Sequence, residues 1–161
     1  MYTNILKTSI AAAGMLMMFA GVAFAQEQSG KLKECSIATL QGSFGYTSTG
    51  TLLDSFVPPP FAGPFAEVGR QTFDGKGKTE ATATISSNGN IQQQATIQGT
   101  YTVNADCTGS MTLNIPAFGA TVHADFVIDH DGAEIRAVVT ETGVIESRVY
   151  RKQFRERRKE E

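Results

Sequence analysis

The 161-residue chain has no tryptophan, two histidines, two cysteines and a single long apolar run. So few histidines, and no Cys-x-x-Cys spacing, leave little material for a metal centre or a thiol redox site. The chain also has no Gly-x-Ser-x-Gly elbow, and Gly77-Lys78-Thr79 lacks the earlier glycine of a phosphate-binding loop. The sequence therefore indicates no catalytic residues, and we expect no metal and no cofactor.

Basic residues are scarce except at the C-terminal end. Residues 26–147 carry 6 basic and 13 acidic residues, a net charge of −7, whereas residues 148–161 carry 7 basic and 3 acidic residues, a net charge of +4. A nucleic-acid-binding domain has basic residues over a face of the fold itself, so we expect no nucleic-acid partner. We interpret the charged tail 155–161 as a solvated terminus, with contact to an anionic envelope surface as the alternative.

The first 25 residues have the features of a cleaved secretory signal. Lys7 precedes the apolar run 10–25, and Ala23-Phe24-Ala25 matches the small-x-small cleavage pattern. A membrane anchor is the alternative, but the run has 16 residues, fewer than the ~20 needed to cross a bilayer. We therefore expect cleavage between Ala25 and Gln26, no membrane span in the mature chain, and an exported (periplasmic or extracellular) protein.

Both cysteines, Cys35 and Cys107, lie in the expected mature chain. In an exported protein such a pair most simply forms one disulfide, with two buried thiols as the alternative. The bridge would close a loop of roughly 70 residues, which the chain-entropy account values at about 4 kcal/mol.

Glycine-centred turns recur along the mature chain between short segments rich in Thr, Val, Ile, Phe and Tyr. Asn88-Gly89 and Asp131-Gly132 are typical of tight turns between antiparallel strands. The alternation of apolar and polar residues predicts strands near 40–50, 65–74, 78–87, 90–103, 108–115, 119–129, 132–141 and 144–154. Eight consecutive strands with one apolar face can close into an antiparallel up-and-down barrel, which leaves no unpaired edge. We therefore predict an all-β barrel domain over 40–154, after an N-terminal segment 26–39.

The predicted inward face combines small residues with large ones. An eight-stranded barrel is wide enough to be filled by side chains or to hold one small ligand, and both alternatives stay open. The segment 52–64 contains four prolines and several large apolar residues, so we expect a long loop that packs on the barrel. The candidates for lining a small apolar ligand are Phe44, Tyr46, Gln93, Ala95, Tyr101, Ala124 and Phe126. Ile91 is placed on the same inward face.

Four polar residues could lie on either face of their strands. The alternation does not fix the face of Glu67, Arg70, Gln93 or Arg136. If Glu67 or Gln93 points inward, it needs a partner in the barrel or on a ligand.

The two histidines each suggest a site that a simpler interpretation explains better. His123 and Asp125, with Asp129 nearby, could act as a metal or acid–base group, but no full ligand set is visible and we interpret them as a solvated face. His130 lies in a sequence similar to a calcium loop but without the distal glutamate, so we interpret it as a turn.

Three stretches carry a resemblance to known proteins: 40–46 (LQGSFGY), 63–75 (GPFAEVGRQTFDG) and 99–109 (GTYTVNADCTG). Together they resemble a family of small secreted bacterial proteins with no assigned activity, which is similar to the calycin-type barrels and in particular to the allene oxide cyclase-like barrel. The resemblance implies a fold, and no functional residue of the plant cyclase maps onto a numbered position here. The leading hypothesis is a non-enzymatic binding or surface-associated module for a small apolar ligand. A cofactor-independent isomerase or cyclase and a purely structural envelope protein are the alternatives.

Overall fold

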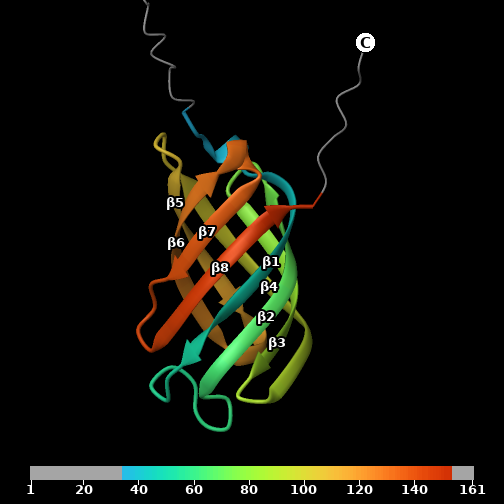
Figure 1. Cartoon of the computed structure of the whole chain (residues 1–161), viewed down its shortest axis with the longest axis vertical. Helices are drawn as coiled ribbons and strands as arrows, with labels where there is room; N and C mark the ends of the chain where they lie inside the picture. Colours follow the sequence, from blue (N-terminus) through green and yellow to red (C-terminus); the bar gives the residue numbers. More distant parts are fainter. Residues whose placement is uncertain (1–33, 154–161) are drawn as a thin grey trace, which may run out of the picture. The chain divides into compact units, whose positions relative to one another are not determined.

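Eight antiparallel strands follow one another around a closed barrel, and β1 completes the closure by pairing with β8 (Figure 1). The computed structural model describes residues 34–153, so the expected signal 1–25 and the tail 155–161 lie outside the described residues. The strands are β1 (Gln41–Leu52), β2 (Gly63–Asp74), β3 (Lys78–Ser87), β4 (Asn90–Val103), β5 (Thr108–Ile115), β6 (Ala120–Asp129), β7 (Glu134–Val139) and β8 (Val144–Lys152). The predicted all-β, eight-stranded up-and-down barrel is therefore confirmed.

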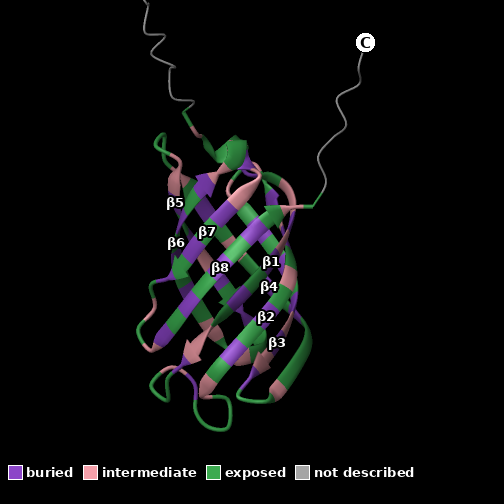
Figure 2. Ribbon diagram, viewed as in Figure 1, coloured by how far each residue is buried: buried purple, intermediate pink, exposed green. Residues whose placement is uncertain are grey.

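The alternation of side chains explains why this sequence closes into a barrel. In β6, for example, Val122, Ala124, Phe126 and Ile128 are buried while the residues between them are exposed. Figure 2 shows the same alternation of buried and exposed residues along the strands. Each strand thus has one face that must leave water, and a sheet closed on itself buries all eight apolar faces in one core.

The alternation fails at the start of β4, where two sequence predictions are wrong. Ile91 is 66% exposed rather than inward, and Gln93 is also exposed, so it cannot line the interior. The register shifts between Ala83 and Ile85 of β3, and the facing residue Gln94 has a positive φ of 54°. Such a β-bulge places an extra residue in one strand and breaks the period of two.

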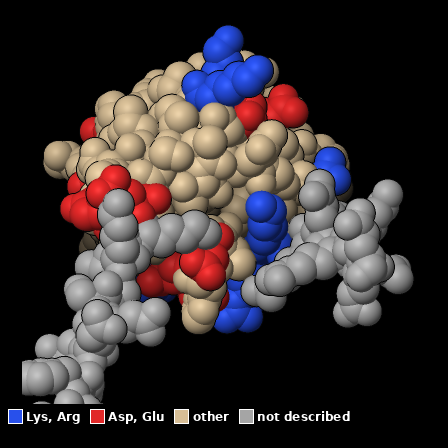
Figure 3. Space-filling view, turned by 90° about the horizontal axis from the view of Figure 1, so that it is seen from above, with Lys and Arg blue, Asp and Glu red and all other residues tan. Residues whose placement is uncertain are grey.

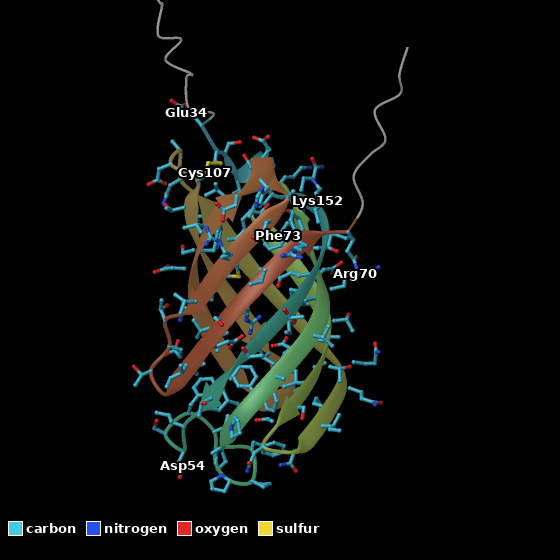
Figure 4. All side chains as sticks on the ribbon, viewed as in Figure 1. Glu34, Asp54, Arg70, Phe73, Cys107 and Lys152 are labelled. Atoms are coloured by element: carbon cyan, nitrogen blue, oxygen red, sulfur yellow. A yellow bond between two sulfur atoms is a disulfide. The ribbon has the colours of Figure 1, made fainter. Side chains whose placement is uncertain are left out.

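The two ends of the barrel are closed differently. Near the start of β1, Cys35 is joined by a disulfide to Cys107, as predicted, and the short 3-10 helix η1 (Ile37–Thr39) follows. At the other end of β1, the predicted loop runs over residues 53–62 and includes the buried Val57. Figure 4 shows Cys107 and Asp54, which marks this loop, at opposite ends of the barrel.

The outer surface carries charged side chains of both signs, seen in Figure 3 around one end of the barrel. Among the described residues, no helix is long and apolar enough to cross a membrane.

Candidate functional site: a polar cluster inside the barrel

Five polar side chains from three adjacent strands meet inside the barrel. We call them the polar cluster: Tyr46 and Ser48 of β1, Glu67 of β2, and Glu146 and Arg148 of β8, all of them buried. The strand register explains why they meet, because Ser48 pairs with Glu67 on one side and with Arg148 on the other. All three residues belong to the inward set of their strands, so neighbouring strands place them side by side.

Arg148 is the centre of the contacts within the polar cluster. Its Nε donates a hydrogen bond to Glu146 Oε1, which also accepts one from Ser48 Oγ at 2.5 Å. Its Nη2 forms an ion pair with Glu67 Oε2 at 3.5 Å, and Tyr46 Oη donates to the other oxygen of Glu67. The guanidinium carbon also lies 5.7 Å from the centre of the Tyr46 ring, within cation–π range. One cation therefore contacts two carboxyl groups and one aromatic ring.

Burial alters the protonation of this cluster. It raises the pKa of Glu67 above its ordinary value, more than the opposing effects of Arg148 and Tyr46 lower it. Burial alone lowers the pKa of Arg148, but Tyr150, Glu67 and Glu146 outweigh it and hold that pKa well above the ordinary value. Arg148 is thus always charged, whereas its raised pKa lets Glu67 take up a proton more readily than an exposed carboxyl group.

Two buried polar atoms have no hydrogen-bond partner among the described residues. One is Nη1 of Arg148, whose side chain is only 2% exposed, and the other is Oε1 of Gln71. The amide nitrogen of Gln71 does have a partner, since it donates to Thr79 Oγ1 at 2.9 Å. Buried polar groups without a partner are uncommon, and each one requires an explanation.

Small residues lie beside the polar cluster along the register. Tyr46 of β1 pairs with Gly69 of β2. Gly69 pairs with Ala83 of β3, which pairs with Ala95 of β4. Across these four strands, the tyrosine is therefore followed by three small residues at the same level of the barrel. A Cβ atom at Gly69 would lie 2.7 Å from Cε1 of Tyr46, closer than such atoms approach in proteins. Glycine at position 69 is therefore what lets the Tyr46 ring lie against β2.

The structure brings together only part of the site that the sequence predicted. Phe44, Tyr46, Ala95, Tyr101, Ala124 and Phe126 are all buried in the core, whereas Gln93 is not. Only Tyr46 of these belongs to the polar cluster. Sequence reasoning missed Glu146 and treated Arg148 as part of a basic C-terminal segment, but the structure buries both.

The histidine and aspartate residues considered as ligands lie outside the barrel. His123 Nδ1 is 2.9 Å from Glu141 Oε2, and Asp129 forms an ion pair with Arg136 at 2.6 Å. His130 lies in the short 3-10 turn η3 (His130–Gly132), as its interpretation as a turn predicted. Within residues 34–153, no group of three or more His, Cys, Asp or Glu side chains could hold a metal ion.

Comparison with known proteins adds little to this description. No protein-family model and no curated protein matches the chain. One similar solved structure is a redesigned β-barrel, 14% identical, with a TM-score of 0.49 over 74% of this chain and 96% of that chain. Another is the redesigned β-barrel mFAP1 bound to DFHBI, 16% identical, with a TM-score of 0.49 over 73% of this chain and 98% of that chain. At these values the comparison assigns no function, and the fold is established by the strand pairing itself.

Glu67 should make the free energy of unfolding depend on pH. Because its pKa is raised on folding from 4.5, the folded chain binds more protons than the unfolded chain above that pH. This stabilising contribution is complete below about pH 4.5 and is lost as the pH rises through the folded-state pKa. Urea unfolding of wild type and Glu67→Gln between about pH 4.5 and 8 should show a shallower fall with pH in the variant. The exposed Glu80→Gln is the control, and an equal slope in wild type and Glu67→Gln would contradict the expectation.

Proposed function

We propose that the protein is a non-enzymatic binding module that holds one small ligand, apolar over most of its surface, inside the barrel. The observation that carries this proposal is the buried Arg148, whose Nη1 has no partner among the described residues. Replacing a buried ion pair with apolar residues is often neutral or stabilising, so a barrel that serves only as a scaffold does not need this cluster. A ligand with a polar group gives the unpartnered nitrogen a role.

The surroundings of Arg148 suit such a ligand. Small-molecule sites are mostly apolar, with a few polar groups that fix the orientation of the ligand. Ala137 is the register partner of Arg148 on β7, and Ala83, Ala95 and Ala124 are further small residues of the buried inward face. By contrast, three hollows of about 510, 590 and 660 Å³ are lined chiefly by residues of the outer face and are open to solvent.

We also propose that the protein is exported and belongs to the calycin type, with an allene oxide cyclase-like barrel. The support for export is the signal-like sequence of residues 1–25 together with the disulfide, which is typical of oxidising compartments. The support for the barrel type is the resemblance of the three stretches described above.

A second candidate function, a cofactor-independent isomerase or cyclase, is favoured by one observation. Glu67 is a buried carboxyl with a raised pKa that accepts a hydrogen bond from Tyr46, and such groups serve in proton transfer. Turnover of a bound ligand that is lost in Glu67→Gln would establish this function in place of simple binding.

Filling the interior tests the binding proposal. Ala95→Leu adds volume inside the barrel beside the row of small residues, whereas Ala66→Leu adds the same volume on the outer face of β2. We expect wild type and Ala66→Leu to bind the neutral fluorophore Nile red alike, and Ala95→Leu to bind it at least ten-fold more weakly because leucine occupies the ligand's space. Fluorescence titration measures the binding, and urea unfolding measures the stability of the same samples.

A filled interior gives the opposite result. Overpacking would then destabilise Ala95→Leu by about 1–3 kcal/mol, and wild type would bind no Nile red. Native mass spectrometry of protein purified from its own source adds an independent readout. The absence of both a retained small molecule and Nile red binding would overturn the proposal in favour of a purely structural protein.

A further inference from the structure

We infer that the polar group of the ligand is a neutral hydrogen-bond acceptor, a carbonyl or hydroxyl oxygen held by Nη1 of Arg148, and not a carboxylate. This inference rests on the proposed function and names the class of ligand that the interior selects. It follows from the hydrogen bonds and charges that Arg148 already has.

Two of the three guanidinium nitrogens of Arg148 already contact carboxyl groups. Its Nε donates a hydrogen bond to Glu146, and its Nη2 forms an ion pair with Glu67. The two carboxyl groups therefore leave only Nη1 without a carboxyl contact. Nη1 has no hydrogen-bond acceptor within residues 34–153 and is buried with the rest of the side chain. The buried Tyr150 also interacts with the guanidinium and helps to hold its pKa high. A guanidinium nitrogen only donates hydrogen bonds, so the missing partner is an acceptor.

The charges of the polar cluster disfavour an anionic ligand. Glu67 and Glu146 already place two acidic groups on one guanidinium, with no other basic residue among the buried polar side chains of the described chain. A carboxylate ligand would bring a third acidic group to a single cation in a site shielded from solvent, where unbalanced charge is costly. A ketone, amide or alcohol oxygen completes the hydrogen bonding of Nη1 and adds no charge. The interior therefore favours a neutral ligand.

Apolar residues follow Arg148 along the register on one side and polar residues on the other. Arg148 pairs with Ala137 on β7, and Ala137 pairs with Phe126 on β6. The inward residues next to Arg148 on this side are therefore apolar. On the other side, Ser48 and Glu67 continue the polar row. A ligand with its oxygen on Nη1 would therefore find apolar contacts for its hydrocarbon part on the side of β6 and β7.

Two probes with the same number of carbons separate the alternatives. Decan-2-one and decanoate differ in the head group, and at pH 7.5 only decanoate is charged. Isothermal titration calorimetry of the full mature chain should show that decan-2-one binds at least ten-fold more tightly than decanoate. Arg148→Lys keeps the positive charge but removes the guanidinium fork, so we expect it to weaken decan-2-one binding about ten-fold. The matched control is Arg151→Lys, an exposed arginine of the same strand, which should leave binding unchanged.

A further variant keeps the test decisive if Arg148→Lys does not fold. Glu67→Gln removes one acidic group, so at a pH above the folded-state pKa of Glu67 the preference for decan-2-one over decanoate should narrow several-fold while the ketone still binds. Decanoate binding as tightly as the ketone to wild type, or an undiminished preference in Glu67→Gln, would overturn the inference but leave the binding function intact. If wild type binds neither probe and no Nile red, the proposed function fails, and the inference fails with it.

Discussion

Replacing Arg148 with methionine should lower the free energy of unfolding by about 3–5 kcal/mol. The change keeps much of the side-chain volume but leaves Glu67 and Glu146 inside the barrel without their shared cation. Removing one partner of a buried ion pair is strongly destabilising because the remaining charge stays out of water. Urea denaturation followed by circular dichroism at pH 7 measures the effect.

A surface arginine provides the matched control for this experiment. Arg136 forms an ion pair with Asp129 at 2.6 Å, but its side chain is 60% exposed, so Arg136→Met should change the free energy of unfolding by at most about 1 kcal/mol. Removing the charges together is the second control: Arg148→Met combined with Glu67→Leu and Glu146→Leu should recover much of the lost stability. If Arg148→Met is no more destabilising than Arg136→Met, the polar cluster does not contribute to stability as described.

The sequence was sufficient to predict the fold because most of the strands separate their apolar and polar residues onto opposite faces. In β6 the buried residues occupy every second position, so both the strand and its inward face were predictable. The bulge in β4 was not predictable, because it depends on a positive φ at Gln94, a residue that is not glycine. Nothing in the run of three glutamines at 92–94 marks which of them interrupts the alternation, and Ile91 and Gln93 were misplaced for that reason.

The polar cluster was harder to predict because β8 has apolar residues on both faces. Its inward set is Val144, Glu146, Arg148 and Tyr150, and its outward set includes the exposed Ile145 and Val149. Hydrophobicity alone does not choose between these two sets. The choice is made by the closure of the barrel, since the pairing of Ser48 with Arg148 brings the charged residues beside the inward face of β1. The sequence left open which face of its strand Glu67 lies on. Its ion-pair partner Arg148 lies 81 positions later in the chain, so only the tertiary structure brings the two together.

Removing the disulfide between Cys35 and Cys107 should lower the free energy of unfolding by about 4 kcal/mol, because it closes a loop of 72 residues and so restricts the unfolded chain. Cys35→Ala combined with Cys107→Ala gives the variant, and urea unfolding under non-reducing conditions gives the measurement. Two hydrogen bonds should hold this end of the barrel in the variant, one from Cys35 N to Ala105 O at 3.0 Å and one from Tyr101 Oη to Leu40 O at 2.9 Å. The folded circular dichroism spectrum should therefore be unchanged.

Reduction of the wild-type protein distinguishes the loss of the bridge from the loss of the cysteine side chains. Dithiothreitol should destabilise wild type by nearly as much as the double substitution, and it should have no effect on the double variant, since no other cysteine is present in the chain. A reductant effect below about 1 kcal/mol would contradict the expected contribution of the closed loop. Because the restriction acts on the unfolded chain, ligand binding by the folded double variant should match that of wild type.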